Sequence, residues 1–145
     1  MLAGDDLVYI AEVGGDTLTM FEARSNIGRP LLATAGGKAL LATLPDRERE
    51  AFLRRHGPGE RDLVEAFLAE YDEIKRTRIA TNLRLNGTRF ALATTVLNHA
   101  GDAVASVTLV GRAADLQPRA TELAETLLQY VNAWSQRSMT PREAI

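Results

Sequence analysis

Hydrophobic and polar residues are arranged along the first third of the chain in two different patterns. Residues 5–13 and 17–25 are rich in β-branched and aromatic side chains and flank a glycine turn, which predicts a β-hairpin. The stretch SNIGRP at 25–30 predicts a loop. From Thr34 onward the leucines follow a helical period, and Pro45 predicts the start of a second helix.

A longer helical stripe follows the breaker sequence PGERD at 58–62. Asp62 and Glu65 form the D-x-x-E pattern of a capping box, so this helix is expected to start at Asp62. Its apolar residues recur at helical spacing and predict a face turned to the core: Leu63, Val64, Phe67, Leu68, Tyr71 and Ile74.

Three strand candidates come next, at residues 78–85, 88–98 and 103–110. The sequence NHAGD at 98–102 predicts a hairpin turn between the last two, and LQP at 116–118 opens a final helix. Strands joined by short hairpins pair antiparallel, and helices then cover the sheet. The chain is therefore predicted to form one α+β domain.

Composition and charge narrow the function classes. The chain has 145 residues, of which 46% are hydrophobic and 25% charged, with a formal net charge of −2. That balance gives no general attraction to nucleic acid. The chain contains no cysteine. This excludes disulfides and cysteine-ligated metal and is typical of a protein in a reducing compartment. No signal peptide or membrane-length apolar run is recognisable, so a cytoplasmic location without membrane contact is expected.

The sequence GGK at 36–38 suggests a site for an anion. A phosphate loop of the Walker type fails here, because Leu32 replaces its first glycine and Ala39 replaces its magnesium-binding hydroxyl. Thr34 is a natural N-cap, however, and the free amides of a helix start can hold a carboxylate or a phosphate. The alternative is that the glycines simply permit close packing, and the residues alone leave both possibilities open.

Enzyme chemistry finds little support in the sequence. His56 and His99 lie far apart and form no metal motif. Asp102 lies near His99, but no serine is placed to complete a triad. We therefore predict no catalytic residues, no metal and no cofactor.

Three segments together resemble the effector-binding domain of the IclR family of bacterial transcriptional regulators. They are GDDLVYIAEV at 4–13, IGRPLLATAGGKALLATLPDRERE at 27–50 and DAVASVTLVGRAADLQP at 102–118. The central segment is the most specific, since it is close to the family run P-L-H-A-T-A-x-G-K-A with Leu32 in place of histidine.

The resemblance implies a GAF-like fold that encloses a pocket for a small effector, often an organic acid or an aromatic compound. It also implies self-association into dimers or tetramers, and DNA contact only through a separate N-terminal winged helix-turn-helix. Residues 1–138 would form the effector-binding domain, lacking the first helix and strand expected in the family, and 139–145 a tail. The remaining alternatives are an oligomerisation module with a vestigial pocket and, less favoured, an enzyme acting on a small acid.

The resemblance also places candidate effector contacts, and the chain departs from the family at several of them. Arg78 and Ile79 replace a Gly-Tyr pair, Asn82 replaces an acidic residue, and Ala91 replaces a cysteine. Strand alternation would put Arg89, Ala93 and Thr95 on the face of Ala91. The predicted effector-binding set is Thr34, Ala35, Gly36, Gly37, Asn82, Arg89, Ala91, Thr95 and Thr108.

Overall fold

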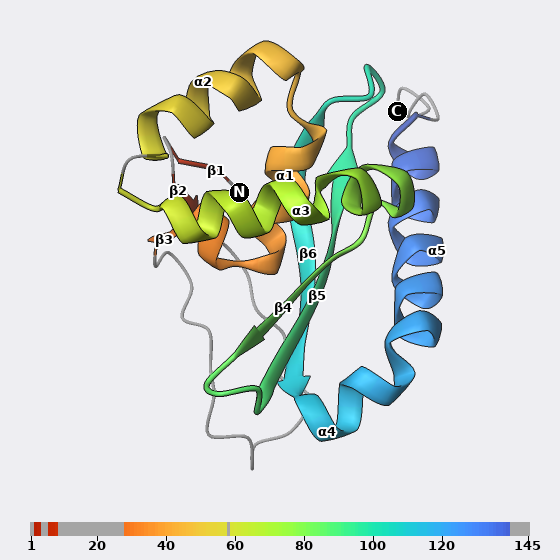
Figure 1. Ribbon diagram of the computed structural model, residues 1–145. Helices are drawn as coiled ribbons and strands as arrows, with labels where there is room; N and C mark the ends of the chain where they lie inside the picture. The colour runs from red at the N-terminus through yellow and green to blue at the C-terminus, as the bar shows by residue number, and fades with distance from the viewer. Residues whose placement is uncertain (1, 4–5, 9–27, 58, 140–145) are drawn as a thin grey trace.

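The computed structural model describes residues 2–3, 6–8, 28–57 and 59–139 (Figure 1). A small antiparallel sheet joins β1 (Leu2–Ala3), β2 (Asp6–Val8) and β3 (Gly28–Pro30) in that order. The stretch 28–30 was predicted as loop, but its backbone pairs with β2. Most of the hairpin predicted for 5–25 lies outside the described residues.

The first helices start close to where the sequence predicts them. A 3₁₀ turn, η1 (Leu31–Ala33), leads into α1 (Ala35–Thr43), which Thr34 caps as predicted. After Pro45 comes α2 (Asp46–His56), and α3 (Arg61–Thr77) follows.

The predicted capping box at the start of α3 is wrong. The N-cap is Glu60, two residues before Asp62, and it makes no side-chain cap hydrogen bond. Glu65 instead accepts a hydrogen bond from Arg61 at 3.1 Å. The ion pair between residues four apart replaces the reciprocal capping bonds.

The main sheet is antiparallel, with the order β4 (Ala80–Arg84), β5 (Arg89–Leu97) and β6 (Ala103–Arg112). Its strands match the predicted segments apart from their ends. The hairpin turn after β5 is also confirmed, because the Asn98 amide donates to the Asp102 carbonyl at 2.9 Å. Gly101 occupies the left-handed region there, with φ of 85°.

The chain ends in α4 (Ala113–Leu116), a second 3₁₀ turn η2 (Gln117–Arg119) and the long helix α5 (Ala120–Met139). Figure 1 shows α1 and α3 on one face of the main sheet and α5 along the other. The predicted α+β arrangement, an antiparallel sheet between helical layers, is confirmed.

Two apolar clusters hold these layers together. One lies between α1, α3 and the sheet and includes the buried residues Leu40, Leu41, Phe67, Ala91 and Ala93. The other lies under α5 and includes Phe90, Leu92, Leu127 and Val131. The alternation of Ala91 and Ala93 with Phe90 and Leu92 assigns each face of β5 to its own helical layer.

The predicted core stripe of α3 is partly wrong. Phe67 and Ile74 are buried, but Leu63 and Leu68 are exposed, at 37% and 54%. The helix contacts the rest of the domain through a narrow face, so residues at the margin of the stripe stay in solvent.

Candidate functional site

The start of α1 is a buried, tightly packed turn. The Thr34 hydroxyl accepts a hydrogen bond from the Gly37 amide at 2.9 Å and donates to the Leu31 carbonyl at 3.3 Å. A Cβ on Gly37 would lie 2.1 Å from that same carbonyl oxygen. Close packing therefore requires glycine at position 37, and one of the amides available for an anion is already capped.

Asn82 joins this turn to the sheet. Its Nδ2 donates to the Ala33 carbonyl at 3.0 Å, and its backbone pairs with Ala91 on β5. Ala91 is 8% exposed and packs in the cluster beneath α1. The structure thus brings together the part of the predicted set formed by residues 34–37, Asn82 and Ala91.

Sequence reasoning missed the role of Lys38 at this junction. The lysine is 6% exposed, and its Nζ donates to Glu70 Oε2 at 2.8 Å and to the Thr81 carbonyl at 2.6 Å. The ammonium group therefore ties α1 to α3 and β4 at once. The lysine of the GGK stretch had suggested binding of an anion, but its ammonium group instead pairs with Glu70 and Thr81 within the domain.

The remaining predicted residues are spread along the sheet. Thr108 pairs with Ala93, so it shares the face of β5 that lies under α1. Arg89 and Thr95 lie toward opposite ends of β5, roughly 20 Å apart at the usual rise per residue. One small ligand cannot touch both of them, so the predicted set does not form a single site.

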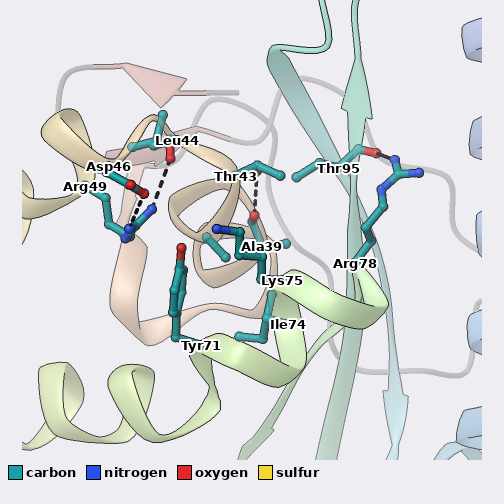
Figure 2. A pocket seen from close by; sticks show the side chains of 11 residues that line it. Ala39, Thr43, Leu44, Asp46, Arg49, Tyr71, Ile74, Lys75, Arg78 and Thr95 are labelled. Carbon is teal, nitrogen blue, oxygen red and sulfur yellow. Dashed lines mark hydrogen bonds and ion pairs between the residues drawn. The ribbon is translucent and has the colours of Figure 1, made fainter.

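Thr95 lines a cavity of about 280 Å³ near the C-terminal end of α1. Figure 2 shows side chains from α3 reaching toward α1 and the start of α2, with Arg78 beside Thr95. The lining residues are Ala39, Ala42, Thr43, Leu44, Asp46, Arg49, Tyr71, Ile74, Lys75, Arg78 and Thr95. Apart from Thr95, none of them belongs to the predicted effector-binding set.

The polar atoms around this cavity are incompletely paired. Among the described residues, three buried side-chain atoms lack a hydrogen-bond partner, namely Tyr71 Oη, Arg78 Nε and Thr95 Oγ1. All three belong to residues that line the cavity. Most buried polar groups in proteins have a hydrogen-bond partner. The presence of three unpaired ones around a single cavity therefore calls for an explanation.

Positive charge dominates the lining. Arg49 donates to Asp46 Oδ1 at 2.6 Å and to the Leu44 carbonyl at 3.2 Å, and its guanidinium lies 4.4 Å from the centre of the Tyr71 ring. The hydrogen bond and charge of Arg49, and to a smaller extent the charge of Lys75, lower the pKa of Asp46, so this carboxylate offsets only part of the positive charge around it. Lys75 Nζ lies 5.7 Å from the same ring centre.

Arg78 adopts an unusual backbone. It caps α3 in the left-handed region, with φ of 62°, where a residue with a Cβ is disfavoured by about 1 kcal/mol. Its guanidinium donates to Asn132 Oδ1 at 3.0 Å and to the Thr95 carbonyl at 3.2 Å. Neither partner carries a charge, so these contacts leave the positive charge of Arg78 uncompensated.

Comparison with known proteins identifies the chain. A family model described as the C-terminal domain of the bacterial transcriptional regulator IclR matches residues 1–136. The chain belongs to the IclR family. The probable transcriptional regulator SauR of Cupriavidus necator is 29% identical over 147 residues, covering 89% of this chain and 58% of the relative. The chain thus spans little more than half of the curated relative's length.

Solved structures agree with the assignment of this chain to the IclR family. A putative transcriptional regulator from Rhodococcus sp. RHA1 has a TM-score of 0.79 at 25% identity, covering 93% of this chain and 58% of that one. The Thermotoga maritima IclR also has a TM-score of 0.79, at 22% identity, with coverage of 94% and 58%. A double mutant of the inducer-binding domain of Acinetobacter PobR, solved in complex with 3-hydroxybenzoic acid, has a TM-score of 0.70 at 16% identity, covering 92% of this chain and 83% of that one. The predicted GAF-like fold is confirmed.

No helix among the described residues is long and apolar enough to cross a bilayer. Nor do three or more histidine, aspartate or glutamate side chains gather there in a group that could hold a metal ion.

Proposed function

We propose that this domain is the effector-sensing part of an IclR-type regulator and binds a small organic acid beside the start of α1. The observation that carries the proposal is the junction at Asn82, which fixes the capped turn of α1 against the Ala91 face of the sheet at 3.0 Å. A ligand held between a helix start and a rigid strand can favour one conformation of the domain. Residues 34–37, Asn82, Ala91 and Thr108 are the proposed contacts, and Arg89 would approach the acid from the near end of β5.

The small side chains of this face favour a less polar effector. Asn82 replaces a carboxylate expected from the family pattern, and Ala91 replaces a cysteine, so polar contacts are lost and the smaller side chain at position 91 would leave space for a ligand. An aromatic acid would use that space through apolar contact, which a two-carbon acid cannot. The PobR domain, solved with 3-hydroxybenzoic acid, is a structural neighbour whose ligand is of this kind.

We expect benzoate to raise the melting temperature of the domain more than glyoxylate does at equal concentration. Ala91→Leu should abolish the benzoate effect, because the added carbons fill the proposed space. The matched control is Ala69→Leu, which adds the same atoms at an exposed position on α3. A thermal-shift series measures all three proteins, and stabilisation by glyoxylate-sized acids alone would contradict the proposal.

We propose that a separate N-terminal part of the full regulator binds the DNA. A net charge of −2 gives this chain no electrostatic hold on a phosphate backbone. Effector binding would act on DNA by shifting the relative placement of two such parts in an oligomer. The regulators that resemble this chain support a role in transcription over a role as an enzyme.

We also propose that the domain self-associates, and that the exposed aromatic pair on α5 contributes to it. Tyr130 and Trp134 are 60% and 43% exposed, with ring centres 6.5 Å apart. Large exposed aromatic side chains are typical of interface centres. Sedimentation velocity should show a dimer or larger species for the wild type and a smaller one for Tyr130→Glu. A monomeric wild type at high micromolar concentration would rule this out.

A further inference from the structure

We propose a second ligand site in this domain: the cavity between α1, α2 and α3 binds a small dicarboxylate. This site is separate from the effector site at the start of α1, because its residues surround the other end of that helix. It does not depend on the effector site being occupied.

The space is sufficient for a short acid and little more. A cavity of about 280 Å³ is slightly smaller than the roughly 300 Å³ at which the usual range of small-molecule sites begins. Alanines from α1 and Ile74 from α3 form an apolar wall. The carbon chain of a short diacid can lie against such a wall while its ends reach polar groups.

The hydrogen-bonding capacity of the cavity matches an acceptor. The Tyr71 and Thr95 hydroxyls and the Arg78 Nε–H can all donate, and none of these buried atoms has a partner in the described structure. Thr95 is 1% exposed, so water in bulk does not satisfy its hydroxyl. Carboxylate oxygens, with about four acceptor positions in each group, would satisfy all three donors.

The charge of the cavity calls for two negative charges. Arg49 is neutralised by Asp46, whereas Lys75 and Arg78 have no carboxylate within hydrogen-bonding distance in the described structure. Both cations line the same cavity and repel each other, and Arg78, which is only partly exposed, also loses part of its hydration, whereas Lys75 is exposed to solvent. A dianion would relieve both costs, and the bidentate shape of a carboxylate fits the guanidinium of Arg78.

The backbone at Arg78 supports a role in binding. A left-handed conformation at a residue with a side chain costs stability, and such strain concentrates at functional sites. Glycine would avoid the cost at this helix end. The chain instead places a long cationic side chain there, and that side chain lines the cavity.

Succinate is a suitable probe, and its neutral diamide, succinamide, is the matched ligand control. We expect calorimetry on the 145-residue chain to show saturable succinate binding at one site and none for succinamide. Arg78→Gln should weaken succinate binding at least tenfold. Arg76→Gln removes the same charge from the exposed side of the same helix, where Arg76 pairs with Glu73, and should change affinity less than twofold.

Thr95→Val separates binding from folding. Valine keeps the shape of threonine and removes the unpaired hydroxyl, so the melting temperature should stay the same or rise by about 2 to 4 °C, while succinate affinity falls severalfold. If Thr95 had only a structural role, Thr95→Val would not weaken succinate binding while the melting temperature is maintained.

Two outcomes would overturn the proposal. One is the absence of saturable succinate binding to the folded chain. The other is binding that both Arg78→Gln and Thr95→Val leave unchanged. If such binding were removed by Ala91→Leu instead, succinate would occupy the effector site at the start of α1. That result would refute the second site and leave the proposed function standing.

Discussion

Replacing Gly37 by alanine should destabilise the domain by about 3 kcal/mol. The added Cβ would lie 2.1 Å from the Leu31 carbonyl oxygen and 2.6 Å from the Leu31 Cα. Both atoms belong to backbone, which cannot rotate away as the tip of a side chain can. The turn η1 would have to move, and the cap that Thr34 provides would move with it.

Chemical denaturation measures this loss of stability, and Gly59→Ala is the matched control. A Cβ at Gly59 meets no atom within 4 Å, so that variant should stay within about 0.5 kcal/mol of the wild type. Equal stability of the two variants would show that η1 and α1 do not pack as closely as described.

Replacing Lys38 by methionine should cost roughly 2 to 3 kcal/mol. Methionine fills a similar volume, but it leaves the Thr81 carbonyl without the donor that reaches it at 2.6 Å. The effect on the partner carboxylate is smaller, because the Glu70 side chain is 46% exposed and water can solvate it.

Comparing Glu70→Gln with Lys38→Met separates the contribution of the Lys38–Glu70 ion pair from that of the hydrogen bond between Lys38 and Thr81. It keeps a hydrogen-bond acceptor for Lys38 and removes the charge, so denaturation should show a loss of less than about 1 kcal/mol. If Glu70→Gln cost as much as Lys38→Met, the ion pair to α3 rather than the hydrogen bond to Thr81 on β4 would account for the stabilising effect of Lys38.

Much of the fold could be predicted because its signals are local. Thr34 as a helix cap, Pro45 before α2 and the NHAGD turn each follow from the chemistry of a few neighbouring residues. Local patterns can also mislead, as at the start of α3. Asp62 and Glu65 fit a capping pattern, but Glu65 pairs with Arg61, an interaction that is just as local.

The sites were harder to predict because they depend on contacts between distant residues. Strand alternation placed Thr95 in the predicted effector-binding set, whereas in the structure Thr95 lines a cavity near the other end of α1. No local pattern could show that Tyr71 and Arg78 meet Thr95 around one cavity, since α3 and β5 come together only through the packing of α1 and the sheet. The role of Lys38 was missed for the same reason, because its partners lie 32 and 43 residues away.

A calorimetric titration of the wild-type chain with benzoate and, in parallel, with glyoxylate would show directly whether this domain senses an organic acid. We expect saturable binding of benzoate in the micromolar range, weaker binding of glyoxylate, and recovery of both acids unchanged after incubation. Absence of binding by either acid up to millimolar concentration, or chemical conversion of one of them, would contradict a sensing role for this domain.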